Sequence, residues 1–204
     1  MVIIQHQKIT EVLGPGTRLA IWLAGCDKGC KNCINQEGQN EKAGSYYPLS
    51  EVFALIRKSI AKHEIGGITI SGGEPFLQYD ELKGLLSWIK SNTKLDTIVF
   101  TGYKLSDLLK KHGNIKNDVL NYIDVLIDGE YKEELNCGDY LRGSSNQNLY
   151  FFTGKYIHDE RFNSLHKERE FEFEIKDGGE TFFIGIPPIG FYDKFIEQLS
   201  TIAG

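Results

Sequence analysis

Strand-like apolar runs alternate with helix-like segments through most of the chain, and this alternation limits the fold more than any other feature. The predicted strands are 18–24, 67–71, 97–100 and 123–127, and the predicted helices between them are 50–63, 80–90 and 105–112. Ser50 is the predicted N-cap of the first helix. Such alternation is typical of α/β folds, in which right-handed crossovers join parallel strands. A chain of 204 residues can form one such domain with an appendage.

Polar loops follow all four predicted strands. They occupy residues 25–33, 71–75, 101–103 and 128–129. In parallel sheets, ligands bind at the carboxyl ends of the strands. We therefore expect these loops to form one common site.

Three cysteines lie close together in the first of these loops. Cys26, Cys30 and Cys33 have the spacing C-x3-C-x2-C. Three thiolates can hold three irons of a four-iron cluster, whereas a cluster that only carries electrons usually takes four cysteines. The fourth iron is then free to bind a substrate, so the spacing favours a cluster that does chemistry.

A structural zinc site is the main alternative for these cysteines. Zinc sites of this kind need four tetrahedral ligands, usually from paired C-x2-C units. The remaining cysteine, Cys137, lies about a hundred residues away, and no histidine is close in sequence to the triplet. A disulfide framework is disfavoured, because four cysteines are too few and too clustered to staple a chain of this length.

The loop Ser71-Gly72-Gly73-Glu74-Pro75 has two interpretations. Adjacent glycines at a strand end let the backbone turn sharply and approach a ligand, and the Glu74 carboxylate can pair with an amine. The same residues also suit an ordinary βα turn. The cysteine triplet upstream favours ligand binding.

The charge balance and the apolar runs exclude several classes of protein. The net charge is −5 and there is no block of Lys and Arg, so we expect no direct nucleic-acid binding. No apolar run reaches the 18 residues of a membrane span, and residues 1–6 lack the features of a secretory signal. Clustered, reduced cysteines fit the cytoplasm, so we expect a cytoplasmic protein without a membrane partner.

Together, the cysteine triplet and the Gly-Gly-Glu strand end resemble the radical S-adenosylmethionine (SAM) superfamily. Further motifs are similar to those of glycyl-radical activating enzymes, and in particular the anaerobic ribonucleoside-triphosphate reductase activating proteins. These motifs are Gly14-Pro15-Gly16-Thr17-Arg18, Phe100-Thr101-Gly102-Tyr103-Lys104-Leu105, Val125-Leu126-Ile127-Asp128-Gly129 and Arg142-Gly143-Ser144-Ser145-Asn146-Gln147. The resemblance implies a partial (β/α)6-type radical SAM barrel over residues 1–150.

The resemblance assigns roles to the cysteine loop. Cys26, Cys30 and Cys33 would hold a [4Fe-4S] cluster whose open iron binds the amino and carboxylate groups of SAM. Asn32, Cys33 and Ile34 would lie against SAM.

It also assigns roles to the other strand ends. Gly72, Gly73 and Glu74 would hold the methionyl end of SAM. Asp128 matches a strand-end aspartate near the SAM carboxylate, which some relatives combine with a monovalent cation. The run 142–147 would contact SAM or an incoming polypeptide. The competing interpretations are a turn residue for Asp128 and a capped surface loop for 142–147.

The reaction that the resemblance implies is enzyme activation. A flavodoxin- or ferredoxin-like donor supplies one electron, and SAM is cleaved to methionine and a 5′-deoxyadenosyl radical. That radical removes hydrogen from a glycine of a large partner, the anaerobic ribonucleotide reductase. Two alternatives stay open: a radical SAM enzyme with another substrate, either a different glycyl-radical enzyme or a small molecule, and a non-catalytic zinc or iron–sulfur protein.

The chain continues beyond the point where members of this family commonly end. Alternating residues at 169–175, a Gly-rich turn and an apolar run at 181–186 predict a β-hairpin. A short amphipathic helix is predicted from Phe191, Phe195, Ile196, Leu199 and Ile202. We expect residues 151–204 to form a C-terminal extension that packs on the barrel or on a partner.

Overall fold

A computed structural model describes the chain except for residues 137, 163–169, 176–180, 192–193, 196 and 199–204. Cys137, the turn of the predicted hairpin and much of the predicted C-terminal helix lie outside the described residues. The strands are β1 (Val2–Thr10), β2 (Arg18–Leu23), β3 (Ser45–Tyr47), β4 (Gly67–Gly72), β5 (Asp96–Phe100), β6 (Val125–Asp128), β7 (Asn148–Phe151), β8 (Phe171–Ile175) and β9 (Thr181–Gly185). The α-helices are α1 (Leu49–Lys62), α2 (Tyr79–Asn92), α3 (Leu105–Lys111) and α4 (Ile115–Asp118).

A mixed sheet with a parallel centre organises the molecule. Its strand order is β3-β1-β2-β4-β5-β6-β7. The pairs β2–β4, β4–β5 and β5–β6 are parallel, which confirms the predicted α/β class with a mostly parallel central sheet. The outer strands β1, β3 and β7 pair antiparallel. The alternation of strands and helices missed these edges, because β1 carries a polar stretch at residues 5–8 and the other two strands are short.

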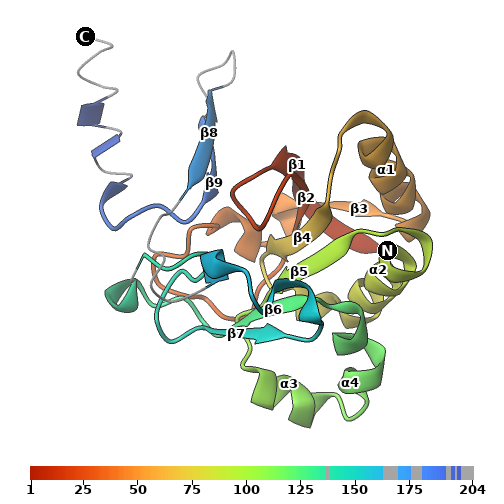
Figure 1. The fold of residues 1–204 in the computed structure, drawn as a ribbon. Coiled ribbons are helices and arrows are strands. Elements are labelled where there is room, and N and C mark those ends of the chain that lie inside the picture. Colours follow the sequence, from red (N-terminus) through yellow and green to blue (C-terminus); the bar gives the residue numbers. More distant parts are fainter. Residues whose placement is uncertain (137, 163–169, 176–180, 192–193, 196, 199–204) are drawn as a thin grey trace.

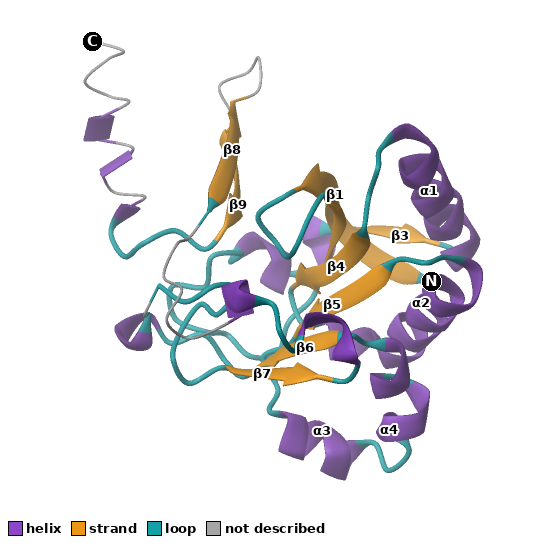
Figure 2. Ribbon diagram, in the orientation of Figure 1, coloured by secondary structure: helices purple, strands orange, loops and turns teal. Residues whose placement is uncertain are grey.

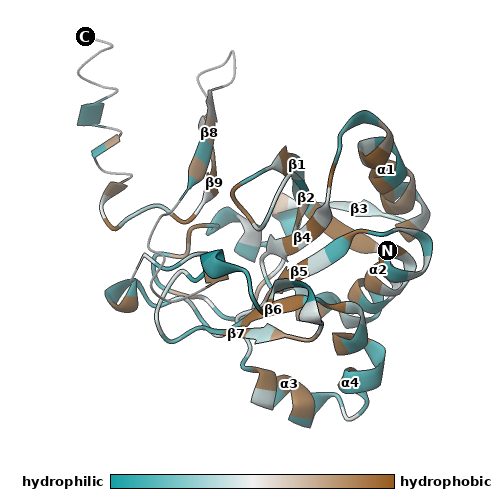
Figure 3. Ribbon diagram, viewed as in Figure 1, coloured by the Kyte–Doolittle hydropathy of each residue, from teal (hydrophilic) through white to brown (hydrophobic). Residues whose placement is uncertain are grey.

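Two helices cover one side of the sheet, as Figure 1 shows for α1 and α2. The predicted inward face of α2 is confirmed: Leu82, Leu85, Leu86 and Ile89 are fully buried. In α1 two details of the prediction are wrong. Pro48, not Ser50, occupies the N-cap position, and Ile60 points to solvent with 41% of its surface exposed. The most apolar ribbon lies in the central strands and on the helix faces toward them (Figure 3).

A buried ion pair ties the strand beginnings together. Arg18 at the start of β2 has no exposed surface, and its Nη2 lies 2.6 Å from Oδ1 of Asp96 at the start of β5. Lys155 Nζ and the Tyr156 hydroxyl donate to Oδ2 of the same carboxylate over 2.6 and 2.7 Å. Burial opposes ionisation of Asp96, but Arg18 and these two hydrogen bonds together lower its pKa below the ordinary value. Arg18 of the predicted Gly-Pro-Gly-Thr-Arg motif is therefore an architectural residue.

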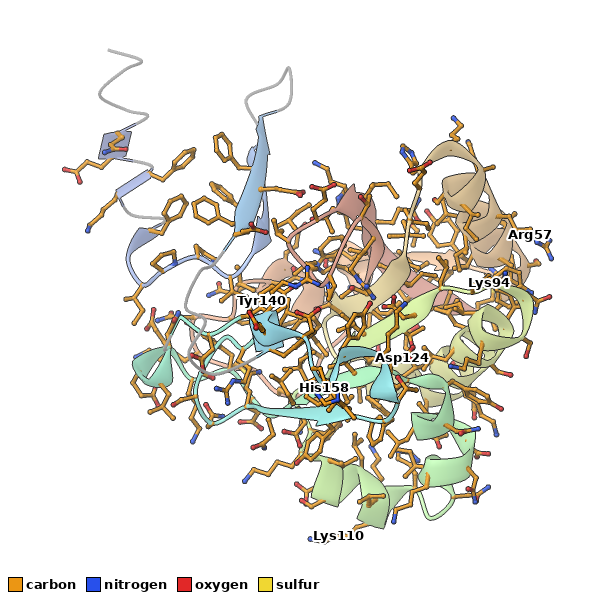
Figure 4. The ribbon with its side chains drawn as sticks, viewed as in Figure 1. Arg57, Lys94, Lys110, Asp124, Tyr140 and His158 are labelled. Carbon is orange, nitrogen blue, oxygen red and sulfur yellow. The ribbon has the colours of Figure 1, made fainter. Side chains whose placement is uncertain are left out.

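The sheet body extends beyond residue 150. Strand β7 spans that position, and Tyr156 and Phe162 pack on the apolar cluster of Ile98, Val125 and Ile127. Figure 4 labels Asp124 at the base of β6, whose carboxylate accepts a hydrogen bond from Thr153 over 2.8 Å. The chain as far as Phe162 thus belongs to the same packed unit as the sheet.

The predicted hairpin is confirmed. Strands β8 and β9 pair antiparallel and project away from the sheet body (Figures 1 and 2). Ile184 anchors the pair, because it is 2% exposed and packs against Leu13 and Ala20. In the part of the chain that the structure describes, no helix combines the length and apolar character needed to cross a bilayer.

Candidate iron–sulfur and SAM site

The cysteine loop leaves β2 and closes on itself through backbone hydrogen bonds. Gly25 adopts a φ of 95°, and its N–H donates to the carbonyl of Gly38 over 2.8 Å. The N–H of Cys26 donates to the carbonyl of Gln39 over 3.0 Å. Residues 26–38 therefore form a closed excursion at the carboxyl end of β2, where the sequence predicted it.

All three cysteines of this loop are half-buried free thiols. Burial raises the pKa of Cys26 and of Cys30 above the ordinary value. Among the described residues, no three His, Cys, Asp or Glu side chains converge on a site for a single ion. A four-iron cube distributes its cysteine ligands over separate irons, so three thiols on one half-buried loop fit its donor set.

A cavity of about 800 Å³ opens beside the loop. Asn32, Cys33 and Ile34 line it together with Ser71 at the end of β4 and Phe100 at the end of β5. The structure thus brings part of the predicted site together. Cys26, Cys30, Gly72, Gly73, Glu74 and Asp128 do not line this cavity.

Asn32 is held in an unusual backbone conformation at the cavity edge. Its φ is 55°, a left-handed value that Asn tolerates better than most residues. Its side-chain amide donates to the carboxylate of Glu133 over 2.5 Å. Ile34, two residues on, leaves 48% of its surface exposed.

Glu74 holds strand-end loops together from a fully buried position. Its carboxylate accepts hydrogen bonds from the Phe76 N–H at 3.0 Å, the Thr101 hydroxyl at 2.8 Å and the Gly102 N–H at 2.7 Å. Burial raises the pKa of this carboxyl group, and the three donors oppose that rise. The side chain thereby joins the end of β4 to the loop after β5.

The two glycines before Glu74 pack against the cysteine loop. A Cβ on Gly73 would lie 2.1 Å from the carbonyl oxygen of Gly25, and Gly72 has a φ of 116°. The Gly73 N–H donates to the Leu23 carbonyl and the Glu74 N–H to the Gly25 carbonyl, both over 2.7 Å. Only glycine at 73 lets the two strand ends approach this closely.

Asp128 lies at the end of β6 and is 1% exposed. Its Oδ2 accepts a hydrogen bond from the Leu105 N–H, at the first turn of α3, over 2.7 Å. Its Oδ1 accepts from the Asn148 side chain over 2.9 Å. The carboxylate therefore connects β6 to α3 and β7.

Comparison with known proteins adds to this geometry. Residues 12–150 match the family model of the 4Fe-4S single cluster domain. The chain is also 34% identical over 152 residues to the anaerobic ribonucleoside-triphosphate reductase-activating protein of Enterobacteria phage T4, a match that covers 72% of this chain and 93% of that protein. The chain belongs to this activating-protein family.

Two further members of the activating-protein family show the same extent of similarity. The protein of Pasteurella multocida is 34% identical over 158 residues, covering 74% of this chain and 97% of the relative. That of Escherichia coli K12 is 29% identical over 148 residues, covering 70% and 94%. The residues that match the family model, 12–150, contain the cysteine loop and the parallel strands β2, β4, β5 and β6.

The run 142–147, one of the motifs that resembled the activating-protein family, forms a tightly bonded loop beside the cavity. Oε1 of Gln147 accepts hydrogen bonds from the N–H groups of Gly143 at 2.8 Å and Ser144 at 3.2 Å. Its Nε2 donates to the Gly129 carbonyl over 2.7 Å. Both Gly143 and Gln147 line the cavity. The loop is capped by its own hydrogen bonds, as expected for a capped surface loop. It also faces the cavity, as expected for a run that contacts SAM or an incoming polypeptide.

The sequence alone did not reveal the side chains that latch the cysteine loop of this family member to its neighbours. The Tyr103 hydroxyl donates a short hydrogen bond to Asp27, and the Lys28 ammonium lies 3.5 Å from the centre of the Tyr103 ring. Lys28 also lies 3.9 Å from the Glu130 carboxylate. Tyr103 and Glu130 follow β5 and β6, so their position after predicted strands was the signal that could have indicated a contact.

Proposed function

We propose that this chain is a radical SAM activating enzyme that reductively cleaves SAM and generates a glycyl radical on the anaerobic ribonucleoside-triphosphate reductase. One observation carries the proposal: a chain of the activating-protein family presents three free thiols on one loop, and Cys33 of that loop opens into a large cavity. When bound, the cluster and SAM supply the one-electron chemistry that this activation needs.

In this proposal the protein binds and orients. Cys26, Cys30 and Cys33 hold the cluster, while Asn32 and Ile34 lie against SAM. The exposed apolar surface of Ile34 supports this, because it lines the cavity next to Cys33. An apolar contact there also excludes water from the reacting groups.

Gly72, Gly73 and Glu74 complete the proposed SAM site through their backbone. The side chain of Glu74 already takes three protein donors, and the N–H groups of Gly73 and Glu74 already donate to Leu23 and Gly25, so the strand-end C=O groups are the parts suited to the methionyl amine. Asp128 acts on the site by fixing the loop after β6, since both its oxygens accept hydrogen bonds from the protein. A monovalent cation near Asp128 would need further oxygen ligands from that loop.

We further infer that the sheet is a shortened form of the partial (β/α)6 radical SAM barrel. The parallel order β2-β4-β5-β6 supports this, and the antiparallel edges β1, β3 and β7 mark the departure from six repeated units. A short, open sheet suits a macromolecular substrate. A flavodoxin- or ferredoxin-like electron donor and a cytoplasmic location complete the proposal.

Anaerobic reconstitution tests the function. We expect about four irons per chain, formation of 5′-deoxyadenosine with dithionite, and a glycyl-radical signal by electron paramagnetic resonance when the reductase of the same organism is added. Replacing Cys26, Cys30 or Cys33 with Ala should abolish SAM cleavage, because each removes an iron ligand.

Cys137→Ala is the matched control and should keep full iron content. If Cys137→Ala emptied the site, a four-ligand site would replace the three-cysteine cluster. SAM cleavage without a radical on the reductase would point to another substrate.

A further inference from the structure

Residues 183–191 of the C-terminal extension line the same cavity as Cys33 and Ile34. We call this segment the apolar wall. It consists of Phe, Ile, Gly and Pro only, so it has no charged or hydroxyl side chain. Ile189 in the wall leaves 57% of its surface exposed. An apolar segment placed over a ligand cavity is typical of the desolvated centre of an interface.

The wall is held in place before any partner binds. Ile184 packs into the cluster of Leu13 and Ala20, and the Glu11 N–H donates to the Glu172 carboxylate over 3.0 Å. Tyr140, labelled in Figure 4, lines a small cleft between the sheet body and Ile186. These contacts fix the base of the wall on the sheet.

Contacts between phenylalanine rings hold the two ends of the wall. The ring centroids of Phe171 and Phe191 are 4.6 Å apart, and those of Phe183 and Phe195 are 5.1 Å apart. Gly185 has a φ of 111°, and a Cβ there would lie 2.8 Å from the Glu170 carbonyl oxygen. A braced wall loses little conformational entropy when it binds.

The wall lies outside the part of the chain that its relatives share. The family model ends at residue 150. The match to the phage T4 protein covers 93% of that protein over 152 residues. The unmatched remainder of that protein is too short to form a hairpin like β8–β9. The wall is therefore a feature of this chain rather than of the shared catalytic unit.

We propose that the apolar wall docks the glycine-bearing segment of the partner and selects a segment without acidic side chains. This inference rests on the proposed function. Small-molecule sites occupy about 300–1,000 Å³, and the cavity of about 800 Å³ lies in the upper part of that range, so part of a peptide segment can enter it. Glu37 and Glu133 on the remaining lining disfavour an acidic segment.

The test places a charge on the wall. Ile189→Lys adds a cation at an exposed position, so the fold is retained, and Ile189→Leu keeps the apolar contact. Ile157→Lys is the matched control, because Ile157 is 56% exposed and does not line the cavity. The probe is a synthetic peptide that spans the reductase glycine, titrated against the full-length protein. Binding is followed by the change in tryptophan fluorescence, since Trp22 lines the cavity.

We expect Ile189→Lys to weaken peptide binding at least tenfold and to lower the ratio of glycyl radical to 5′-deoxyadenosine by the same factor. Ile189→Leu and Ile157→Lys should stay within twofold of the parent. The docking role of the wall would be refuted if Ile189→Lys bound the peptide as tightly as the parent does. It would also be refuted if the variant lost glycyl radical and 5′-deoxyadenosine equally, at an unchanged ratio. Absence of SAM cleavage in the parent itself would overturn the proposed function instead.

Discussion

Three buried carboxylates, on Glu74, Asp96 and Asp128, each join segments that are distant in sequence. Glu74 joins the ends of β4 and β5, Asp96 joins the starts of β2 and β5 to Lys155, and Asp128 joins β6 to α3 and β7. Each carboxylate takes two or more donors, which offset the cost of removing it from water. Changes at these residues should therefore affect the architecture first.

Asp96→Asn should lower the free energy of unfolding by about 3–5 kcal/mol, because it leaves the buried Arg18 guanidinium without its counter-charge. The folded-state pKa of Asp96 lies below the ordinary 3.8, so the carboxylate stabilises the fold at higher pH and loses this contribution as pH falls through the lowered pKa. The free energy of unfolding of Asp96→Asn should therefore lack the part of its pH dependence that comes from this carboxylate.

Guanidinium titrations between about pH 2 and pH 7 measure both effects. Asp107→Asn is the control, since that side chain is 57% exposed and pairs only with the exposed Lys110 in the contacts described. Equal stability of Asp96→Asn and the parent would contradict the role of the ion pair.

Tyr103→Phe should release the latch on the cysteine loop. Hydrogen bonds to a charged group contribute about 1.5–3 kcal/mol, so a chelator should extract iron roughly tenfold faster from the variant. Tyr46→Phe on β3 serves as the control, because Tyr46 is 61% exposed and lies opposite Ile3 of β1, outside the cysteine loop. Identical extraction rates for Tyr103→Phe and the parent would show that the loop is held by its backbone alone.

At the residue scale, the sequence predicted which residues belong to the site better than it predicted the groups that they contact. The cysteine triplet, Glu74 and Asp128 were recognisable because each follows a strand. Their neighbours were not, because Thr101, Leu105 and Asn148 reach them only through the three-dimensional packing of loops that the sequence separates.

Among the elements, the junction of β4 with the cysteine loop controls the site. Gly73→Ala should displace the loop, since the new Cβ would meet the backbone oxygen of Gly25 at 2.1 Å and backbone cannot move aside cheaply. We expect the iron content after reconstitution to fall below half of that of the parent. Gly66→Ala is a matched control with nothing within 4 Å of its Cβ position, and it should reconstitute fully.

Elements with strong periodicity were predictable, and edges were not. Helix α2 and the parallel strands have clear apolar patterns, and the β8–β9 hairpin alternates regularly. The middle of strand β1, residues 5–8, is polar. The strand is therefore fixed by its pairing with β2 rather than by an apolar pattern in its own sequence. Pairing partners are tertiary information, so the antiparallel edges appeared only in the structure.

For the molecule as a whole, the packed body should end near Phe162. A chain that ends at Gly154 loses Lys155 and Tyr156, both bonded to Asp96, and should be insoluble or free of cluster. A chain that ends at Phe162 keeps those contacts and should bind iron, with a lower melting temperature because Leu13 and Ala20 lose Ile184. Solubility and iron content of the two truncations measure this, and equal behaviour would place the boundary elsewhere.

The position of the apolar wall after the strands of the sheet in the sequence has a consequence for biosynthesis. The ribosome releases the cysteine loop and the strands β2, β4, β5 and β6 before residues 183–191 are made. Translation at about 5–20 residues per second separates the two events by several seconds. During that interval the side of Cys33 that the wall later faces is open, so iron–sulfur carriers can reach the cysteine loop from there before the wall is made.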